Sequence, residues 1–315
     1  MNAHALRARR LDISDQLRRV TGWLDHPAIL PGLVLAGAIF AVSQAIAAQP
    51  TPPTTLYDAH AYWLAANAEH PYATTIEAGF DDTVSPYKYR YPPPLAQVLA
   101  PAGLLPWPVF GGLWVAFLFA VFLVLAGRWA PLVLLFPPVL GELYFGNINL
   151  LLALAIVLGM RWPAAWAFVL LTKATPGVGL LWFAFRQEWR SLAVAVTATI
   201  GVAVLSLALA PRLWEEFWQA LVVQAPAAVD VPPLAIQVSL PIRLAISVAV
   251  VFWAARTDRA WLVPVAALVA APAIWGMVPV ILVGAIPLAE GRGVTKPLVG
   301  LRLRRRSGIP AGSGG

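Results

Sequence analysis

The chain has 315 residues, of which 60% are hydrophobic and 12% are charged, and its formal net charge is +7. Soluble domains carry about 25% charged residues, so this composition excludes an ordinary soluble domain and indicates an all-α integral membrane protein. Half of the basic residues lie in the two termini, which indicates membrane orientation and argues against nucleic-acid binding. The sequence has no cysteine, which excludes disulfides and thiolate chemistry.

The N-terminal region predicts a cytoplasmic start and a first span. Residues 1–26 contain five arginines ahead of the apolar run 27–48, and basic residues favour the cytoplasmic side. A run of this length crosses the hydrocarbon as a helix. Its end, AIAAQ, also resembles a signal-peptide cleavage site, but the apolar core exceeds the roughly 7–15 residues typical of such signals. We therefore interpret it as a transmembrane helix.

A long non-cytoplasmic loop is predicted over residues 49–94. The stretch 54–95 contains five of the fifteen acidic residues and two of the four histidines. Most of its tyrosines and tryptophans fit an interfacial belt. Asp58 differs, because it follows the first span closely and lies among aromatic residues. Poor solvation raises the pKa of such a carboxyl toward a value that suits a general base.

The remaining apolar runs predict a multi-spanning bundle of about ten transmembrane helices with both termini in the cytoplasm. After a short or re-entrant helix beyond residue 95, these runs are 107–127, 130–144, 148–160, 163–175, 177–185, 191–210, 236–255 and two short helices within 261–288. The transmembrane domain thus covers 27–290. Residues 291–315 are predicted to be a basic, disordered cytoplasmic tail, and the plasma membrane is the expected location.

In this topology, polar residues that are costly inside a bilayer gather on the non-cytoplasmic side. They are Asp58, Lys88, Arg90, Glu142, Asn147, Asn149, Lys173 and Arg243. Bundled helices would bring them to one outward cleft. Simpler interpretations remain open. Lys173 and Arg243 can snorkel to headgroups, the asparagines can cap a helix, and Glu142 can be an exposed helix end.

An ordered set of short motifs resembles glycosyltransferase family 87. The motifs are YDAHAYW (57–63), YRYPPPL (89–95), GNIN (146–149), KATP (173–176) and QVSLPIR (237–243). The likeness covers residues 27–290 and implies a membrane transferase of the GT-C superfold that uses polyprenyl-phosphate sugars as donors. It implies Asp58 as the catalytic residue. The substrate-binding residues that we expect are Tyr57, His60, Arg90, Tyr91, Asn147, Asn149, Lys173, Gln237, Arg243 and Trp275.

The sequence departs from the family pattern at three places. Asn147 stands where the family usually has Gln, and the first Pro of a Lys-Pro-x-Pro motif is missing after Lys173. Gly276 stands where a His usually follows the late Trp, and no histidine occurs after His70. Any task of that histidine is absent or moved, and His60, two residues from Asp58, is the candidate replacement.

The resemblance implies transfer of a mannose- or arabinofuranose-class unit to a glycolipid or cell-envelope glycan, with membrane lipids around both substrates. Asp58 would take the proton of the acceptor hydroxyl, and a single displacement would invert the anomeric centre. A phosphate leaving group needs no second carboxylate, unlike the glycosidic bond of hydrolases. The charge of the phosphate would be met by Arg90, Lys173 and Arg243. No glycine-rich nucleotide fingerprint occurs and no cofactor is expected, although Asp81 and Asp82 could hold a divalent metal. The alternatives are a polytopic transporter or lipid-sugar flippase, and a structural membrane subunit.

Overall fold

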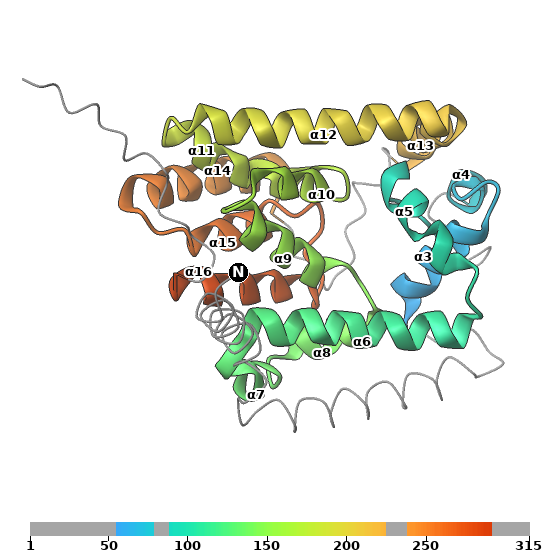
Figure 1. Cartoon of the computed structure of the whole chain (residues 1–315), viewed down its shortest axis with the longest axis horizontal. Helices are drawn as coiled ribbons and strands as arrows, with labels where there is room; N and C mark the ends of the chain where they lie inside the picture. The colour runs from blue at the N-terminus through green and yellow to red at the C-terminus, as the bar shows by residue number, and fades with distance from the viewer. Residues whose placement is uncertain (1–54, 79–87, 225–237, 292–315) are drawn as a thin grey trace, which may run out of the picture.

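The computed structural model describes residues 55–78, 88–224 and 238–291, and these residues form a bundle of helices (Figure 1). The prediction of an all-α protein is confirmed for this part of the chain. Some sequence interpretations fall outside it: the first span 27–48, the pair Asp81 and Asp82, Gln237 and the two charged termini.

The helices follow one another closely along the chain. In order they are α3 (Tyr57–Asn67), α4 (Ala73–Ala78), α5 (Pro93–Gly103), α6 (Trp107–Ala126), η1 (Gly127–Trp129), α7 (Ala130–Val133), α8 (Pro137–Phe145), α9 (Asn149–Gly159), η2 (Pro163–Ala165), α10 (Trp166–Leu170), η3 (Thr175–Leu180), α11 (Leu181–Phe185), α12 (Trp189–Leu209), α13 (Pro211–Gln224), α14 (Leu240–Thr257), α15 (Leu262–Val269), η5 (Val278–Gly284) and α16 (Ala285–Ala289).

Three helical segments in the described residues are long and apolar enough to cross a membrane. They are Trp107–Val133, Trp189–Leu209 and Leu240–Thr257. The pair α8 and α9, which is bent by 111° at the break between its helices, makes a fourth if it is counted as one span. A helix of 20 residues, such as α6, covers about 30 Å, the thickness of the hydrocarbon. The predicted count of about ten spans is therefore not confirmed.

Prolines and glycines explain why the other apolar runs are divided. α8 begins with Pro137 and Pro138 and ends at Gly146, whose φ of 69° is left-handed. Proline fits the first turn of a helix, and glycine adopts the left-handed conformation at its end. The predicted helices 163–175 and 177–185 are realised as η2, α10, η3 and α11, with Pro163 and Pro176 in the first turns of η2 and η3. Each piece is too short to span a bilayer by itself.

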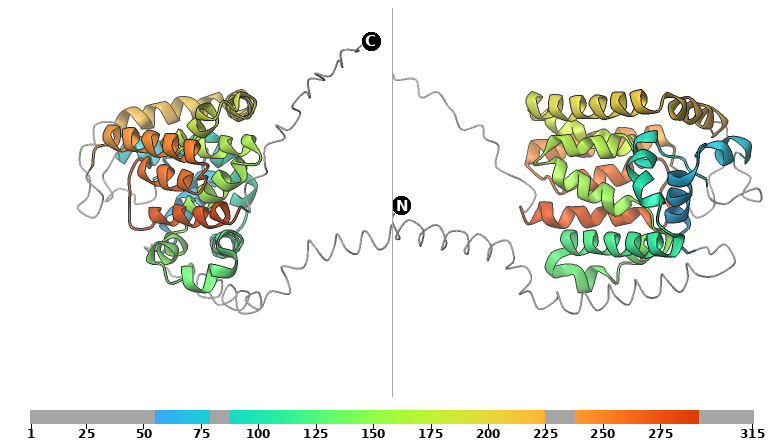
Figure 2. Two further views of the ribbon diagram at one scale, coloured as in Figure 1. Left: turned by 90° about the vertical axis from the view of Figure 1, so that its left-hand side faces the viewer. Right: turned by 45° about the vertical axis from the view of Figure 1, so that its right-hand side comes forward.

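The long helices define the shape of the bundle. α6 and α12 lie roughly parallel on opposite sides, with α9, α10 and α15 between them (Figures 1 and 2). α3, α4, α5 and α13 gather at one end of these helices, and α7 and α11 lie at the other (Figure 1). The first of these two ends carries the predicted site.

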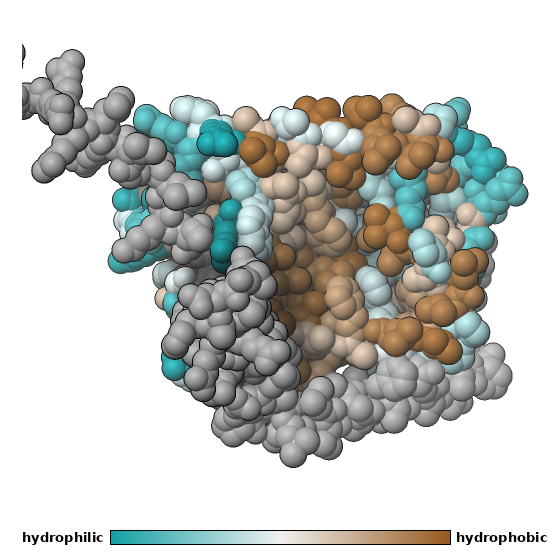
Figure 3. Space-filling model, in the orientation of Figure 1, coloured by the Kyte–Doolittle hydropathy of each residue, from teal (hydrophilic) through white to brown (hydrophobic). Residues whose placement is uncertain are grey.

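The surface of the bundle is apolar in its middle. Figure 3 shows a broad hydrophobic band that runs between hydrophilic residues at the two ends. Along α12 only Ala195 and Ser206 are buried, whereas large apolar side chains such as Ile200 (57% exposed) face outward. Soluble monomers rarely expose so large an apolar area. The apolar helices therefore indicate membrane association.

Polar contacts join elements at both ends. At the α3 end, Nδ1 of His70 lies 2.7 Å from Oε1 of Glu216, and Arg212 donates to the carbonyl of Glu69, which ties α13 to the loop after α3. At the opposite end, the guanidinium of Arg186 lies 2.7 Å from the carboxylate of Asp258. The segment around α3 is thus fixed to the bundle. Its position on the non-cytoplasmic side stays a prediction.

Candidate active site

Asp58 lies in the first turn of α3, which is fixed against the turn between α8 and α9. The backbone N–H of Leu56 donates to the carbonyl of Tyr144 over 2.7 Å, with Leu56 itself in the left-handed conformation. Gly146 packs so closely on α3 that a Cβ added to it would lie 2.7 Å from Cβ of Ala59. This close approach holds Asp58 beside Asn147.

Asn147 connects the carboxylate of Asp58 to Lys173. Nδ2 of Asn147 donates to Oδ2 of Asp58 over 2.8 Å. Oδ1 of Asn147 accepts hydrogen bonds from the backbone N–H of Ile148, at 2.7 Å, and from Nζ of Lys173, at 3.2 Å. Asp58 and Lys173 are far apart in the sequence, and the two hydrogen bonds of one asparagine bring them to the same place.

Asn149 continues this chain of hydrogen bonds to Glu142. Oδ1 of Asn149 accepts from Nζ of Lys173 over 2.7 Å, and its Nδ2 donates to Oε2 of Glu142 over 2.8 Å. Oε1 of Glu142 accepts from the backbone N–H of Leu150 over 3.0 Å. Both Glu142 and Asn149 are fully buried, with 0% exposure. We call Asp58, Asn147, Lys173, Asn149 and Glu142 the polar chain.

Burial and neighbouring charges shift the pKa values of Asp58 and Lys173 in the polar chain. Burial raises the pKa of the Asp58 carboxyl above its usual range, while the hydrogen bond from Asn147 and the charges of Lys173 and Arg90 oppose the rise. Burial likewise lowers the pKa of the Lys173 ammonium, against the attraction of the Glu142 and Asp58 carboxylates. One ammonium therefore lies between two carboxylates in poorly solvated surroundings.

Tyrosines border the polar chain on the side of the YRYPPPL stretch. The ring of Tyr91 lies 5.9 Å from Nζ of Lys173, and the hydroxyl of Tyr62 donates to that of Tyr91 over 3.1 Å. Arg90 is exposed and Tyr57 is half-buried. Of the expected substrate-binding residues, Arg90, Tyr91, Asn147, Asn149 and Lys173 thus lie on or beside the polar chain.

His60 has different surroundings from those of Asp58. Its ring stacks on Trp107, with centroids 4.2 Å apart, and meets Trp63 edge-on at 5.7 Å. Residues two positions apart project from opposite sides of a helix. Burial lowers the pKa of His60 to about 4, so the ring is neutral at pH 7. A role for His60 in place of the missing late histidine stays a prediction.

Position 276, where the family usually has that histidine, has room for a side chain. A Cβ added to Gly276 would meet no atom of the described residues within 4 Å. The neighbouring Trp275 is 41% exposed. The glycine is therefore not required there by close packing.

Arg243 holds together two helices. Its guanidinium donates to the backbone carbonyls of Val238, Val269, Ala271 and Pro272, so it joins the start of α14 to the chain after α15. Its side chain is buried, with 7% exposure. Within the described residues, neither Arg243 nor Trp275 hydrogen-bonds to the polar chain. Phosphate binding by Arg243 stays a prediction, and Gln237 lies outside the described residues.

We expect Arg243→Lys to lower the free energy of unfolding by about 2–4 kcal/mol, because a lysine cannot serve this set of carbonyls and leaves some of them unpaired. Thermal unfolding in detergent would measure the loss. Arg256→Lys, at an exposed position of the same helix, is the control and should change stability by less than about 0.5 kcal/mol. Wild-type stability combined with a raised KM for the donor would instead assign Arg243 to phosphate binding.

Sequence reasoning grouped Glu142 with the polar residues of the outward cleft but gave it no substrate-binding role, and it left Tyr62 out. Glu142 was open to interpretation as an exposed helix end, and the structure corrects this, because the side chain is fully buried. It turns inward because Asn149 and the N–H of Leu150, just beyond the Gly146 turn, supply its hydrogen bonds. An acidic residue shortly before a glycine turn, followed by a helix that begins at Asn149, was the available signal.

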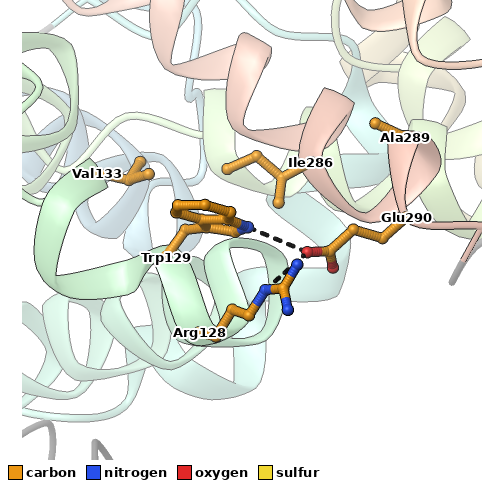
Figure 4. Close-up of a pocket in the computed structure, with 6 residues that line it drawn as sticks. All are labelled: Arg128, Trp129, Val133, Ile286, Ala289 and Glu290. Carbon is orange, nitrogen blue, oxygen red and sulfur yellow. Dashed lines mark hydrogen bonds and ion pairs between the residues drawn. The ribbon is translucent and has the colours of Figure 1, made fainter.

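A separate hollow of about 360 Å³ lies at the opposite end of the bundle (Figure 4). Its lining includes Arg128 and Trp129 from η1 and Glu290 after α16. The carboxylate of Glu290 accepts from Nε1 of Trp129 over 3.0 Å and lies 3.3 Å from Nε of Arg128. None of the expected site residues lines this hollow.

Metal ligands do not cluster in the described part of the chain. Its His, Asp and Glu side chains form no group of three or more that could hold a metal ion. The pair Asp81 and Asp82 lies outside the described residues.

The fold and the polar chain define an apolar helical protein with a buried cluster of carboxylates, amides and one ammonium at one end of its long helices. The model of glycosyltransferase family 87 matches residues 89–289, and the chain belongs to this family. The resemblance to this family is thereby confirmed, and family membership indicates a glycosyltransferase. The motif YDAHAYW (57–63) precedes the matched residues, so the role of Asp58 stays a prediction. No curated protein and no solved structure shows significant similarity to the chain.

Proposed function

We propose that the protein transfers a mannose- or arabinofuranose-class unit from a polyprenyl-phosphate donor to a glycolipid or cell-envelope glycan on the non-cytoplasmic side of the plasma membrane. The observation that carries this proposal is the hydrogen bond from Asn147 to Asp58 within a cluster that also contains Lys173. It places a carboxylate with a raised pKa next to cations, in a family of glycosyltransferases.

Asp58 is the general base of the proposed reaction. Within the described residues only Oδ2 of Asp58 accepts a hydrogen bond, so Oδ1 is the oxygen for the acceptor hydroxyl. As the proton moves to Oδ1, the acceptor oxygen attacks the anomeric carbon, and the bond from that carbon to the phosphate oxygen breaks on the opposite face. The polyprenyl phosphate leaves as an anion, so no general acid is needed, and the anomeric centre is inverted.

Arg90 and Lys173 are the proposed partners of the phosphate. Both charges act on Asp58, so both lie near the reacting atoms. An ammonium has three donors, and two of those of Lys173 serve Asn147 and Asn149, which leaves the third for a phosphate oxygen. Charge on the leaving phosphate grows in the transition state, where fixed cations stabilise it most.

The test is transfer of labelled sugar by the purified protein from polyprenyl-phosphate mannose and polyprenyl-phosphate arabinofuranose to extracted membrane glycolipids. Product from either donor, with the anomeric configuration inverted, supports the proposal. If the wild type moves a donor across vesicle membranes without any transfer, a flippase takes the place of the transferase.

The rate should depend on pH through Asp58. The carboxyl accepts a proton only when ionised, so kcat/KM should rise as pH increases through its pKa and fall as pH decreases below it. Because burial raises that pKa, the rise should lie above the usual range of an aspartate. A pH profile of kcat/KM measures it. A flat profile at acidic pH would exclude Asp58 as the base.

A further inference from the structure

The polar chain contains more residues than the proposed chemistry uses. Asp58 takes the proton and Lys173 meets the phosphate, yet two buried residues, Asn149 and Glu142, extend the hydrogen bonds away from the reacting atoms. Burying an extra carboxylate is costly unless it is hydrogen-bonded. Glu142 is fully buried, and each of its oxygens accepts one hydrogen bond.

The orientation of both asparagine amides follows from the chemistry of their neighbours. An ammonium only donates hydrogen bonds, and a carboxylate only accepts them. Lys173 therefore requires the Oδ1 atoms of Asn147 and Asn149 to face it. The amide N–H groups then point away, one toward Asp58 and the other toward Glu142. Asp58 and Glu142 are thus the two acceptors at the ends of the polar chain, and the donor–acceptor direction of every hydrogen bond between them is fixed.

We propose that Glu142 is a positioning residue, which holds Asn149 and, through it, Lys173, so that Asn147 presents its N–H to Asp58. This inference depends on the proposed function for its kinetic consequence. Glu142 touches neither the donor nor the acceptor in this role. It fixes the direction of the hydrogen bonds that reach the base.

Replacing Glu142 by glutamine should put a donor where the polar chain needs an acceptor. The oxygen of the glutamine amide can still accept from Leu150, and its NH₂ group then faces Nδ2 of Asn149, which is also a donor. If Asn149 turns over, its NH₂ group faces the ammonium of Lys173, another donor. In either arrangement two donors oppose each other, and Lys173 is displaced from Asn147.

A pair of matched substitutions tests the order. Glu142→Gln and Asn149→Asp should each lower kcat by about 10–100-fold, because the base and its partners shift within the site. The double variant Glu142→Gln/Asn149→Asp exchanges the amide and the carboxylate. The double variant restores every donor–acceptor pair and the net charge. Its kcat should therefore be at least about tenfold higher than that of either single variant.

Glu188→Gln is the matched control, because Glu188 is also a glutamate paired with a cation, Arg186, at the other end of the bundle. It should leave kcat unchanged. If Glu142 only stabilises the turn through Leu150, Glu142→Gln keeps that hydrogen bond and should leave kcat unchanged, which would overturn the proposal. Failure of the double variant to recover activity over the two single variants would also overturn the proposal.

A second readout does not need sugar transfer. Dicyclohexylcarbodiimide adds to protonated carboxyl groups, and mass spectrometry of the peptide that contains Asp58 follows the reaction. Weakening the hydrogen bond from Asn147 should speed labelling of Asp58 by about tenfold in each single variant, and the double variant should return it toward the wild-type rate. If the wild type transfers no sugar but labelling follows this pattern, the proposed function fails and the positioning role stands. Equal labelling in all variants would overturn the positioning role.

Discussion

We expect Asp58→Asn to lower kcat for sugar transfer by about 10³-fold, because general-base catalysis contributes about 10²–10⁴-fold and asparagine cannot accept the proton. The substitution preserves the shape of the side chain, and its amide oxygen can still accept the hydrogen bond that Asn147 gives to Oδ2. The site should therefore stay assembled. Initial rates with a labelled polyprenyl-phosphate donor measure the loss.

Three further measurements make this result specific. The KM for the donor should change little, because the phosphate contacts are assigned to Arg90 and Lys173. The residual activity of Asp58→Asn should lose the acidic limb of the pH profile. Asp258→Asn, at the opposite end of the bundle, is the control for loss of an aspartate charge and should transfer sugar at the wild-type rate. Full activity of Asp58→Asn would remove this carboxyl from the reaction.

The second large effect concerns the close approach of α3 to the turn at Gly146. We expect Gly146→Ala to lower the free energy of unfolding by about 2–4 kcal/mol. The backbone φ of 69° disfavours a side chain, and the new Cβ would lie 2.7 Å from Cβ of Ala59. Relief of this contact moves α3, and with it Asp58, so kcat should also fall by about 10²-fold.

Gly201→Ala is the matched control for this substitution. Gly201 lies within α12, and a Cβ there would meet no described atom within 4 Å. Alanine is favoured over glycine inside a helix by about 1 kcal/mol, so this variant should be at least as stable as the wild type. Thermal unfolding in detergent and initial rates compare the two. Equal stability of Gly146→Ala and Gly201→Ala would contradict this prediction. It would show that the turn tolerates a side chain and that α3 moves away from the new Cβ at little cost.

The sequence predicted that the residues of the polar chain lie in one cleft, although it did not predict the hydrogen bonds between them. Asn147, Asn149 and Lys173 lie at ends of apolar runs and Asp58 follows the first run by ten residues, and the positive-inside rule assigns these positions to one side. The structure brings them together. Their catalytic roles stay predictions.

The sequence left the partners of Glu142 and Arg243 undecided for one physical reason. A charged residue in an apolar segment can bind a substrate, reach the headgroups or satisfy backbone groups inside the protein, and its local sequence looks the same in each case. Glu142 accepts hydrogen bonds from an amide and a backbone N–H, and Arg243 donates to four backbone carbonyls. These partners come from other turns and helices, so only packing selects them.

The sequence by itself determined the helical class, the apolar surface and the family, because composition, proline and glycine positions and short motifs are properties of neighbouring residues. The predicted number of full spans is not confirmed within the described residues, since an apolar run records hydrophobicity and not whether its helix is broken or bent. The tertiary structure decided which donor faces which acceptor. A hydrogen bond depends on distances of about 3 Å between side chains, and here those side chains come from α3, the turn after α8, α9 and the loop before η3.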